Sequence, residues 1–274
     1  MCPELFHIGP FPIRSFGLMA MLGFLIPMFI MRKEFARRSI DPELANNIIT
    51  GAIIGGFLGA RLYFIIEHWN DFLLRPWDYI FSGAGLAWYG GFIGGTLAVF
   101  LVIRMSGASA MRVVDVVAPL LILGYAIGRI GCQLAGDGDY GPPSDLPWAM
   151  AYPNGVIPTD VRVHPTPIYD TLLSLALFAL LWKNRMRYPV PGTMFGLSLV
   201  ALGIERFITE FFRTLPKIAF GWMTMAQIIS IGLILAGIVI IYQVTSRAAS
   251  RGMQSDAIGT ETRIINDVKK KKRK

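Results

Sequence analysis

The chain has 274 residues, of which 54% are apolar and only 16% are charged, and its formal net charge is +8. A soluble globular domain has about 25% charged and about 45–50% apolar residues, so this composition disfavours a soluble domain, a disordered chain, a coiled coil and a nucleic-acid-binding module. The length holds several apolar runs of about 20 residues, the length that a bilayer-spanning helix needs. We therefore expect an all-α, polytopic membrane protein with no nucleic-acid partner.

The N-terminus is predicted to be a retained first span rather than a cleavable signal. Its apolar run begins near Phe16, a single basic residue, Arg14, precedes that run, and RKEFARR follows it. A secretory signal has the reverse order, with basic residues first and a small-residue cleavage site last. The two cysteines, Cys2 and Cys132, are too few for the disulfide framework of a small secreted protein.

Seven spans are predicted from apolar runs bounded by charged residues, glycine and proline. In chain order they cover residues 16–31, 46–66, 85–103, 113–135, 167–182, 193–212 and 222–242. No soluble domain remains when these spans are set aside. Residues 1–245 are therefore predicted to form one transmembrane domain, and residues 246–274, which end in KKKKRK, a basic and disordered tail.

The orientation follows from the basic residues of the loops. Eighteen of the 26 lie in loops 32–45, 104–112 and 183–192 and in the tail from residue 243, whereas five lie on the alternate side. Because Lys and Arg accumulate in cytoplasmic loops, we expect the N-terminus outside the cell and the C-terminus in the cytoplasm. The remaining three basic residues, Arg61, Arg129 and Arg206, lie within predicted spans.

These three arginines are the main functional signal. A charged side chain at the centre of the bilayer costs about 2.5–3.5 kcal/mol on insertion scales. Each arginine lies late in an outward-running span, so they are expected to converge in the outer half of the bilayer, at the level of Tyr89 and His164. Guanidinium groups bind phosphate oxygens in pairs, which favours a lipid phosphodiester as ligand. The alternatives are snorkelling to the interface and salt bridges between helices, and Arg206 has Glu210 one turn away.

Several nearby residues have two explanations each. Gly90 and Gly91 admit either a lipid chain or a closely packed helix. His164 lies in the acidic outer loop 136–165 and suits either a hydrogen bond that fixes the loop or an acid/base role. Asp137, in GDGDYG, is better explained as the partner of an arginine than as a metal ligand, because that segment lacks the further ligands of a calcium loop. Neither a metal site nor a cofactor is predicted.

Seven segments carry a resemblance to a known family. In chain order they are IRSFGLMAMLGF, GARLYF, GLAWYGGFIGG, GRIGCQLAGDGDYG, HPTPIYD, RFITEFFR and GWMTMAQIISI. They resemble the prolipoprotein diacylglyceryl transferase family over nearly the whole chain. The resemblance implies seven spans in the bacterial cytoplasmic (inner) membrane and an active site towards the outer leaflet. It also implies transfer of a diacylglyceryl group from phosphatidylglycerol to the lipobox cysteine of a pre-lipoprotein signal peptide, with release of glycerol phosphate.

The resemblance also implies roles for individual residues. Arg129 and Arg206 are expected to hold the lipid phosphate and to stabilise the departing charge, with Glu210 as the carboxylate that orients them. Tyr89 occupies the position of the family's proton-handling histidine. Substrate contacts are expected from Arg61, Gly90, Gly91, Cys132, Asp137, Gly141, His164 and Arg213.

The chain departs from the family pattern at several of these positions. Tyr89 replaces a histidine, Cys132 replaces an asparagine, and the GRIG segment is one residue longer before Gly141. Phe16 and Leu202 each replace a tyrosine. Three alternatives therefore stay open: a transferase with another acceptor, a catalytically impaired paralogue that binds lipid or lipoprotein, and a transporter or channel. The outer position of the charges argues against the last, since transporter sites lie near the bilayer midplane.

Overall fold

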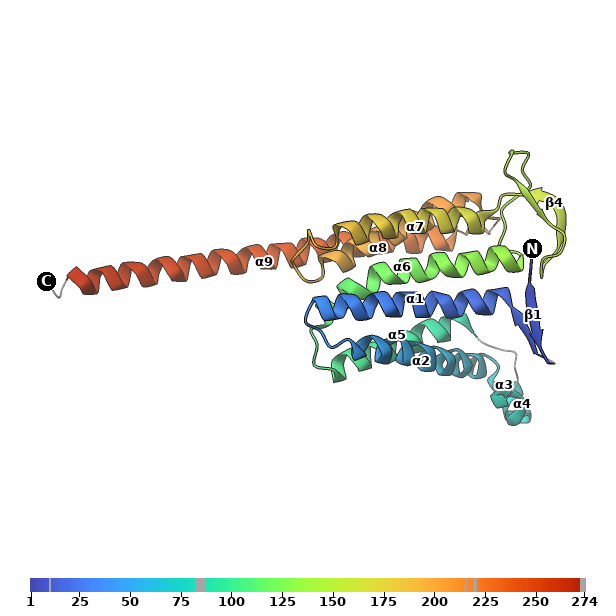
Figure 1. The fold of residues 1–274 in the computed structure, drawn as a ribbon, viewed down its shortest axis with the longest axis horizontal. Helices are drawn as coiled ribbons and strands as arrows, with labels where there is room; N and C mark the ends of the chain where they lie inside the picture. Colours follow the sequence, from blue (N-terminus) through green and yellow to red (C-terminus); the bar gives the residue numbers. More distant parts are fainter. Residues whose placement is uncertain (10, 82–86, 215, 219–220, 272–274) are drawn as a thin grey trace.

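The computed structural model describes residues 1–9, 11–81, 87–214, 216–218 and 221–271, and it is mostly helical (Figure 1). A helix occupies each of the seven segments that the sequence predicts as spans. The elements are α1 (Ser15–Arg37), α2 (Glu43–Glu67), α3 (Trp69–Leu74), α4 (Pro76–Phe81), α5 (Trp88–Met105), α6 (Ala110–Ala135), α7 (Thr166–Asn184), α8 (Thr193–Thr209), the 3₁₀ turn η1 (Glu210–Phe212) and α9 (Met225–Lys271).

Four of these helices are long and apolar enough to cross a bilayer. They are α1, α2, α6 and the first part of α9, Met225–Ser250. Helix α5 is also apolar, but its Tyr89–Met105 segment is shorter. The chain is thus a helical membrane protein, whereas the number of seven crossings and the orientation stay predictions.

Helix α6 forms the centre of the bundle. Helices α1, α7 and α8 pack against it, while α2 packs on α5 and α8 packs on α9 (Figure 1). Its buried residues include Val113, Val116, Ala126 and Arg129, which are spread along its length. Because neighbouring helices cover α6 along its length, the side chains near its end, such as Arg129, are held in fixed positions.

Helices α2 and α5 approach each other through glycine. A Cβ atom built on Gly94 would lie 2.8 Å from Cα of Gly59, and one built on Gly55 would lie 2.6 Å from the carbonyl oxygen of Gly94. Gly90 faces the carbonyl of Gly59 and the side chain of Tyr63 still more closely. Small residues at such spacing permit close contact between membrane helices, so the glycine repeats predict helix packing correctly.

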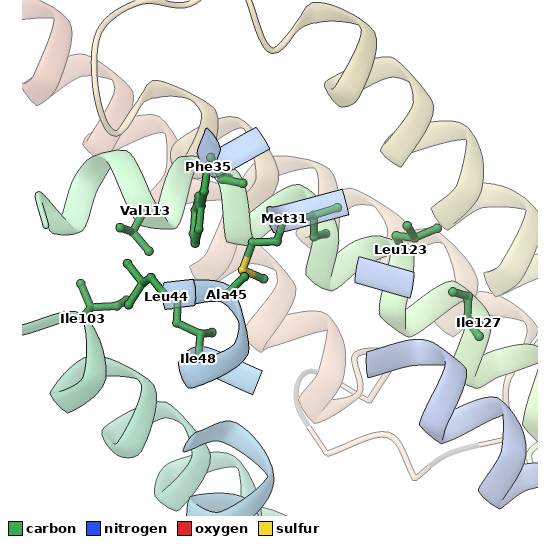
Figure 2. Close-up of a cluster of buried hydrophobic side chains, with 11 residues drawn as sticks. Met31, Phe35, Leu44, Ala45, Ile48, Ile103, Val113, Leu123 and Ile127 are labelled. Carbon is green, nitrogen blue, oxygen red and sulfur yellow. The ribbon is translucent and has the colours of Figure 1, made fainter. Parts of the chain in front are cut away.

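A buried apolar cluster joins four helices near one end of the bundle (Figure 2). It combines Met31 and Phe35 of α1 with Leu44 of α2, Ile103 of α5 and Val113 of α6. These residues lie near the end of α1, the start of α2, the end of α5 and the start of α6. The cluster therefore connects the α2–α5 pair to the rest of the bundle at the end predicted to be cytoplasmic.

Two small β-hairpins lie at the opposite end, and the sequence reading did not predict them. β1 (Glu4–Ile8) pairs with β2 (Phe11–Arg14), and β3 (Met150–Tyr152) pairs with β4 (Thr159–Val163), both antiparallel. The backbone N–H of Cys2 donates to the carbonyl of Leu134 at 3.1 Å, which fastens the first hairpin to the last turn of α6. The strands are only three to five residues long, so their alternation is too brief to be recognised.

Helix α9 continues beyond the last predicted span. Residues 246–271, which the sequence predicts as a disordered basic tail, are helical, and in Figure 1 this part extends away from the other helices. Ala, Arg, Gln, Met, Glu and Lys, all good helix formers, recur along it and account for the continuation.

Candidate active site

The chain turns back at the end of α6, so the loop that follows the helix lies next to Arg129. Gly136 follows the helix with φ 61°, and its N–H donates to the carbonyl of Cys132. A glycine in the left-handed conformation is the usual way to end a helix. The turn directs residues 137–141 back over the last turns of α6, where Arg129 is buried.

The start of α7 brings a second buried charge to the same place. Pro165 and Pro167 flank Thr166 at the start of the helix, where proline needs no N–H partner. The Thr166 hydroxyl donates to the carbonyl of Asp139 at 2.5 Å, which binds the loop after α6 to α7. One turn later Asp170 is fully buried.

Two arginines and two aspartates form one ion-pair network. Arg129 Nε lies 2.7 Å from Asp170 Oδ2, and Arg213 Nη2 lies 2.6 Å from the same oxygen. Asp139 bridges the same two arginines: its Oδ1 lies 2.5 Å from Arg213 Nη1, and its Oδ2 pairs with Arg129 Nη1. The network has no net charge, which lowers the cost of burying four ionised groups.

The carboxyl of Asp139 lies in the loop beyond α6 and stays ionised. Burial acts to raise its pKa, but the Arg129 and Arg213 guanidinium groups outweigh burial and hold the pKa below its usual value. Arg213 stays charged for the same reason, since Asp170 and Asp139 raise its pKa against the effect of burial. At neutral pH Asp139, in the loop after α6, therefore contributes a negative charge to the network, and Arg213, directly after η1, contributes a positive charge.

A second ion pair lies where α8 ends and α9 begins. Arg206 Nη2 lies 2.8 Å from Glu210 Oε2, and Glu210 Oε1 accepts a hydrogen bond from the Thr224 hydroxyl at 2.7 Å. Thr224 also forms a capping box with Gln227: each backbone N–H donates to the side chain of the other residue, at 3.1 and 3.3 Å. The GWMTMAQ segment thus starts α9 and positions the carboxylate that pairs with Arg206.

Several buried polar atoms around the network have no hydrogen-bond partner among the described residues. Three are guanidinium nitrogens: Arg129 Nε still lies in an ion pair with Asp170 Oδ2, which leaves Arg129 Nη2 and Arg213 Nε as the unpartnered donors. The acceptors include Asp170 Oδ1 and both carboxylate oxygens of Glu205, a residue that is only 1% exposed. Because buried polar groups are nearly always hydrogen-bonded, the two unpartnered guanidinium N–H groups indicate a site for an anion.

The structure brings together some of the residues that the sequence selects. Arg129, Arg206, Glu210 and Arg213 all lie where α6, α7 and α8 meet at one end of the bundle. Cys132 is buried beside them, and Arg129 Nη1 lies 3.4 Å from its sulfur. The expected convergence of Arg61, Arg129 and Arg206 on one site stays a prediction.

The role expected of Asp137 falls to Asp139 instead. Asp137 Oδ1 accepts the backbone N–H of Asp139 at 3.3 Å, so it stabilises the turn. Asp139 forms the ion pairs with the two arginines because the two φ-positive glycines, Gly136 and Gly138, rotate the loop so that the second aspartate faces α6. The spacing alone does not distinguish the two carboxylates.

Gly141 and His164 fix the long loop between α6 and α7. The N–H of Gly141 donates to the carbonyl of His164 at 2.9 Å, and a Cβ on Gly141 would lie 2.8 Å from the Cβ of His164. Trp148 Nε1 donates to the Tyr169 hydroxyl at 2.8 Å, and that hydroxyl lies 3.1 Å from Nδ1 of His164. These contacts favour the loop-fixing explanation of His164.

Tyr89, Gly90, Gly91 and Arg61 lie on the α2–α5 pair. The Tyr89 ring is 6.5 Å from the ring of Tyr63 on α2, and Tyr89 is 61% exposed. Arg61 is buried and its Nε donates to the carbonyl of Ile80 at 3.2 Å, which ties α2 to α4. The contacts of Gly90 and Gly91 are with α2. The structure supports a packing role for the glycines.

Asp139, Asp170 and Glu205 are not selected by the sequence analysis. Asp170 stands in HPTPIYD, five residues after Pro165, and Glu205 stands in the α8 span directly before Arg206. Both are acidic residues within predicted spans, which is the same signal that selects the three arginines. Within the described part of the chain, no group of three or more His, Cys, Asp or Glu side chains is arranged to hold a metal ion.

Comparisons with known proteins place this site in a family context. A family model described as "Prolipoprotein diacylglyceryl transferase" matches residues 3–243. Three curated relatives bear the name phosphatidylglycerol–prolipoprotein diacylglyceryl transferase. The protein from Gloeobacter violaceus is 31% identical over 255 residues, covering 90% of this chain and 94% of the relative. Those from Clostridium tetani and Methylococcus capsulatus are 32% and 33% identical, covering 87% and 90% of this chain and 96% and 97% of the relatives.

Proposed function

This chain belongs to the prolipoprotein diacylglyceryl transferase family, and we propose on that basis that it transfers the diacylglyceryl group of phosphatidylglycerol to a prolipoprotein. We take the acceptor to be the lipobox cysteine thiol of the signal peptide. In that reaction the sulfur forms a bond to the glyceryl carbon, the bond from that carbon to the phosphate oxygen breaks, and glycerol phosphate leaves with the electron pair. The thiol proton passes to a base.

The observation that carries the proposal is the pair of unpartnered guanidinium donors. Arg129 Nη2 and Arg213 Nε are buried and have no hydrogen-bond partner among the described residues. Donors held in place before the reaction stabilise charge that develops on a leaving group. A lipid phosphate between Arg129 and Arg213 would accept from both, and Arg206 would approach from the side of α8.

The carboxylates have a positioning role in this proposal. Asp170 and Asp139 hold the two guanidinium groups at fixed positions, and Glu210 does the same for Arg206. Because the arginines already have partners, they need no reorganisation when phosphate enters. Cys132 lies within reach of Arg129, and we expect it to line the phosphate site.

The thiol proton needs an acceptor. The contacts of His164 with Gly141 and Tyr169 favour a role in fixing the loop rather than in proton transfer. Tyr89 stays the proposed acceptor, with Arg61, Gly90 and Gly91 as proposed contacts of the substrate at the α2–α5 side. Replacement of Tyr89 by Phe then lowers the transfer rate while leaving phosphatidylglycerol binding unchanged.

We also propose seven crossings of the bacterial cytoplasmic membrane, with the N-terminus outside and the active site towards the outer leaflet. Two observations support this orientation: the distribution of basic residues among the loops, and the position of the site residues at helix ends on a single side of the bundle. Arg129 lies near the end of α6, Asp170 near the start of α7 and Arg206 near the end of α8. In the predicted orientation these three helix ends are all on the outer side.

A direct assay tests the function. Purified protein in detergent micelles is mixed with phosphatidylglycerol and a lipobox peptide, and the diacylglyceryl peptide is detected by its mass. We expect transfer to the cysteine peptide and none to a peptide with serine in place of cysteine. Replacing Arg129 or Arg213 with Gln is expected to lower the rate by about 10²–10³-fold, the usual effect of removing a charge-stabilising donor.

Arg75 provides the matched control, because it is an exposed arginine of the α3–α4 segment outside the ion-pair network. Arg75→Gln should transfer at the wild-type rate. If the wild-type protein, verified as folded, transfers nothing, the proposed function is wrong. If Arg129→Gln retains the wild-type rate, the enzyme can be active but the proposed phosphate site is wrong.

A further inference from the structure

A second cluster of arginines lies at the end of the bundle opposite the candidate active site. The end of α1, the start of α6 and the segment after α7 meet there around a cavity of about 370 Å³. Four arginines line it, together with one acid and an aromatic residue: Arg37, Arg38, Arg112, Arg185, Asp115 and Tyr188. The site already described contains none of these residues.

The two carboxylates next to this cavity already form hydrogen bonds or ion pairs within the chain, so they do not neutralise all four arginines. Asp115 accepts the backbone N–H groups of Gly192 and Phe195, at 2.7 and 2.8 Å, and so caps the start of α8. Glu34, which is 3% exposed, is the acid shared by three of the arginines and does not line the cavity. Counting Glu34 and Asp115 against four arginines, the cluster keeps a net charge of +2.

The guanidinium groups are held in place. Arg185 Nε lies 3.3 Å from Glu34 Oε2, its Nη1 donates to the carbonyl of Trp182, and its guanidinium lies 4.5 Å from the centre of the Trp182 ring. Arg38 Nε lies 2.8 Å from Glu34 Oε1. Arg112 differs, since it makes no ion pair with any residue in the described part of the chain and is exposed. Its charge is thus available to an external anion.

The position of the cavity indicates which class of anion it binds. The helices end at this level, and the apolar side chains of α7 one turn before its end are exposed: Leu180 is 58% exposed, and Met186 beyond the helix is 59% exposed. A charged cavity beside an exposed apolar helix face at the membrane boundary matches a phospholipid, whose phosphate is next to its acyl chains. Basic pockets between membrane helices recognise anionic headgroups in this way.

We propose that this cavity binds the phosphate headgroup of an anionic phospholipid from the leaflet opposite to the one that faces the active site. The bound lipid is a structural ligand that joins the ends of α1, α6 and α7, and it is not the substrate. The headgroup phosphate contacts Arg112 and Arg185, and the acyl chains follow the exposed face of α7. The proposal does not depend on the transferase activity.

Native mass spectrometry of the intact chain in detergent tests the proposal. The protein is titrated with phosphatidylserine, an anionic lipid, and separately with phosphatidylcholine, and bound lipids are counted by mass. We expect the first to be retained and the second to be lost. Arg112→Gln should weaken phosphatidylserine binding about five-fold, because each basic residue near an anionic lipid surface contributes about 1 kcal/mol.

Arg104→Gln is the matched control, since Arg104 is an exposed arginine in the last turn of α5 and does not line the cavity. Both variants are expected to keep the wild-type melting temperature without added lipid. Equal retention of phosphatidylserine by the two variants would overturn the proposal. If inorganic phosphate alone displaces the lipid at millimolar concentration and raises the melting temperature as much as the lipid does, the cavity binds free phosphate and the lipid assignment is wrong.

Discussion

At the level of single residues, the candidate site is built around two carboxylates with different exposure. Asp170 is fully buried and contacts both Arg129 and Arg213, whereas the side chain of Asp139 is 36% exposed and contacts the same two arginines. Removing one partner of a buried ion pair leaves the other charge uncompensated. The two aspartates are therefore expected to differ in what their loss costs.

Asp170→Asn is predicted to destabilise the protein more than Asp139→Asn. The first change leaves two buried guanidinium groups with a single, half-exposed carboxylate, and loss of a buried partner costs about 3–5 kcal/mol. The measurement is the free energy of unfolding of both variants in detergent. Equal losses for the two variants would show that burial does not distinguish the two carboxylates.

The stability of the folded chain is expected to depend on pH in the acid range because of Asp139. Its pKa in the folded chain lies below the ordinary value of 3.8, so its ion pairs contribute stability that is fully present above that value and is lost as the pH falls through the lowered pKa. We predict that the melting temperature of the wild type decreases more steeply below about pH 4 than that of Asp139→Asn. Parallel curves for the two proteins would contradict this prediction.

The charged residues of the site could be predicted only in part. Arg129, Arg206 and Glu210 stand out as charges in apolar spans, and the pairing of Arg206 with Glu210 was foreseen as an alternative because the two residues are one turn apart. Which aspartate reaches Arg129 depends on the backbone turn at Gly136 and Gly138, since Asp137 and Asp139 are only two residues apart. A linear motif does not contain that information.

At the level of elements, glycine contacts determine how α2 and α5 pack. Gly90→Ala is predicted to destabilise the pair, because the added methyl group would overlap the backbone of Gly59 and the Tyr63 side chain. Overpacking of this kind costs about 1–3 kcal/mol. Gly232→Ala, in α9, is the control: nothing lies within 4 Å of its added Cβ, so stability should be unchanged or slightly higher. The measurement is the melting temperature of both variants, and equal melting temperatures would contradict the packing role of Gly90.

The helices were predictable from apolar runs, but the connections were not. Each of the seven runs is helical because its length and composition leave the backbone no other way to satisfy its hydrogen bonds in lipid. The hairpins β1–β2 and β3–β4 depend on long-range contacts, such as the one between Cys2 and Leu134. Residues 82–86, which lie within the predicted span 85–103 or just before it, are outside the described part of the chain.

At the level of the whole molecule, the predicted orientation can be tested with the native cysteines. Cys2 is exposed beside the hairpin at the outer end, and Cys132 is buried. A membrane-impermeant maleimide added to intact cells is predicted to label the wild type but not Cys2→Ala. Labelling of Cys132→Ala should match the wild type. If the wild type is labelled only after the cells are permeabilised, the predicted orientation is wrong.

The neutrality of the network formed by Arg129, Arg213, Asp139 and Asp170 has a further consequence for substrate capture. A site with excess positive charge attracts anions from a distance, and dissolved salt weakens that attraction. Here each guanidinium already faces a carboxylate of its own chain, so the network attracts anions only weakly from a distance, and an incoming phosphate meets the two unpartnered donors, Arg129 Nη2 and Arg213 Nε, at short range. Discrimination among lipids then depends on how well a headgroup phosphate fits between these two donors, and the enzyme does not simply collect the most negative lipid in the membrane.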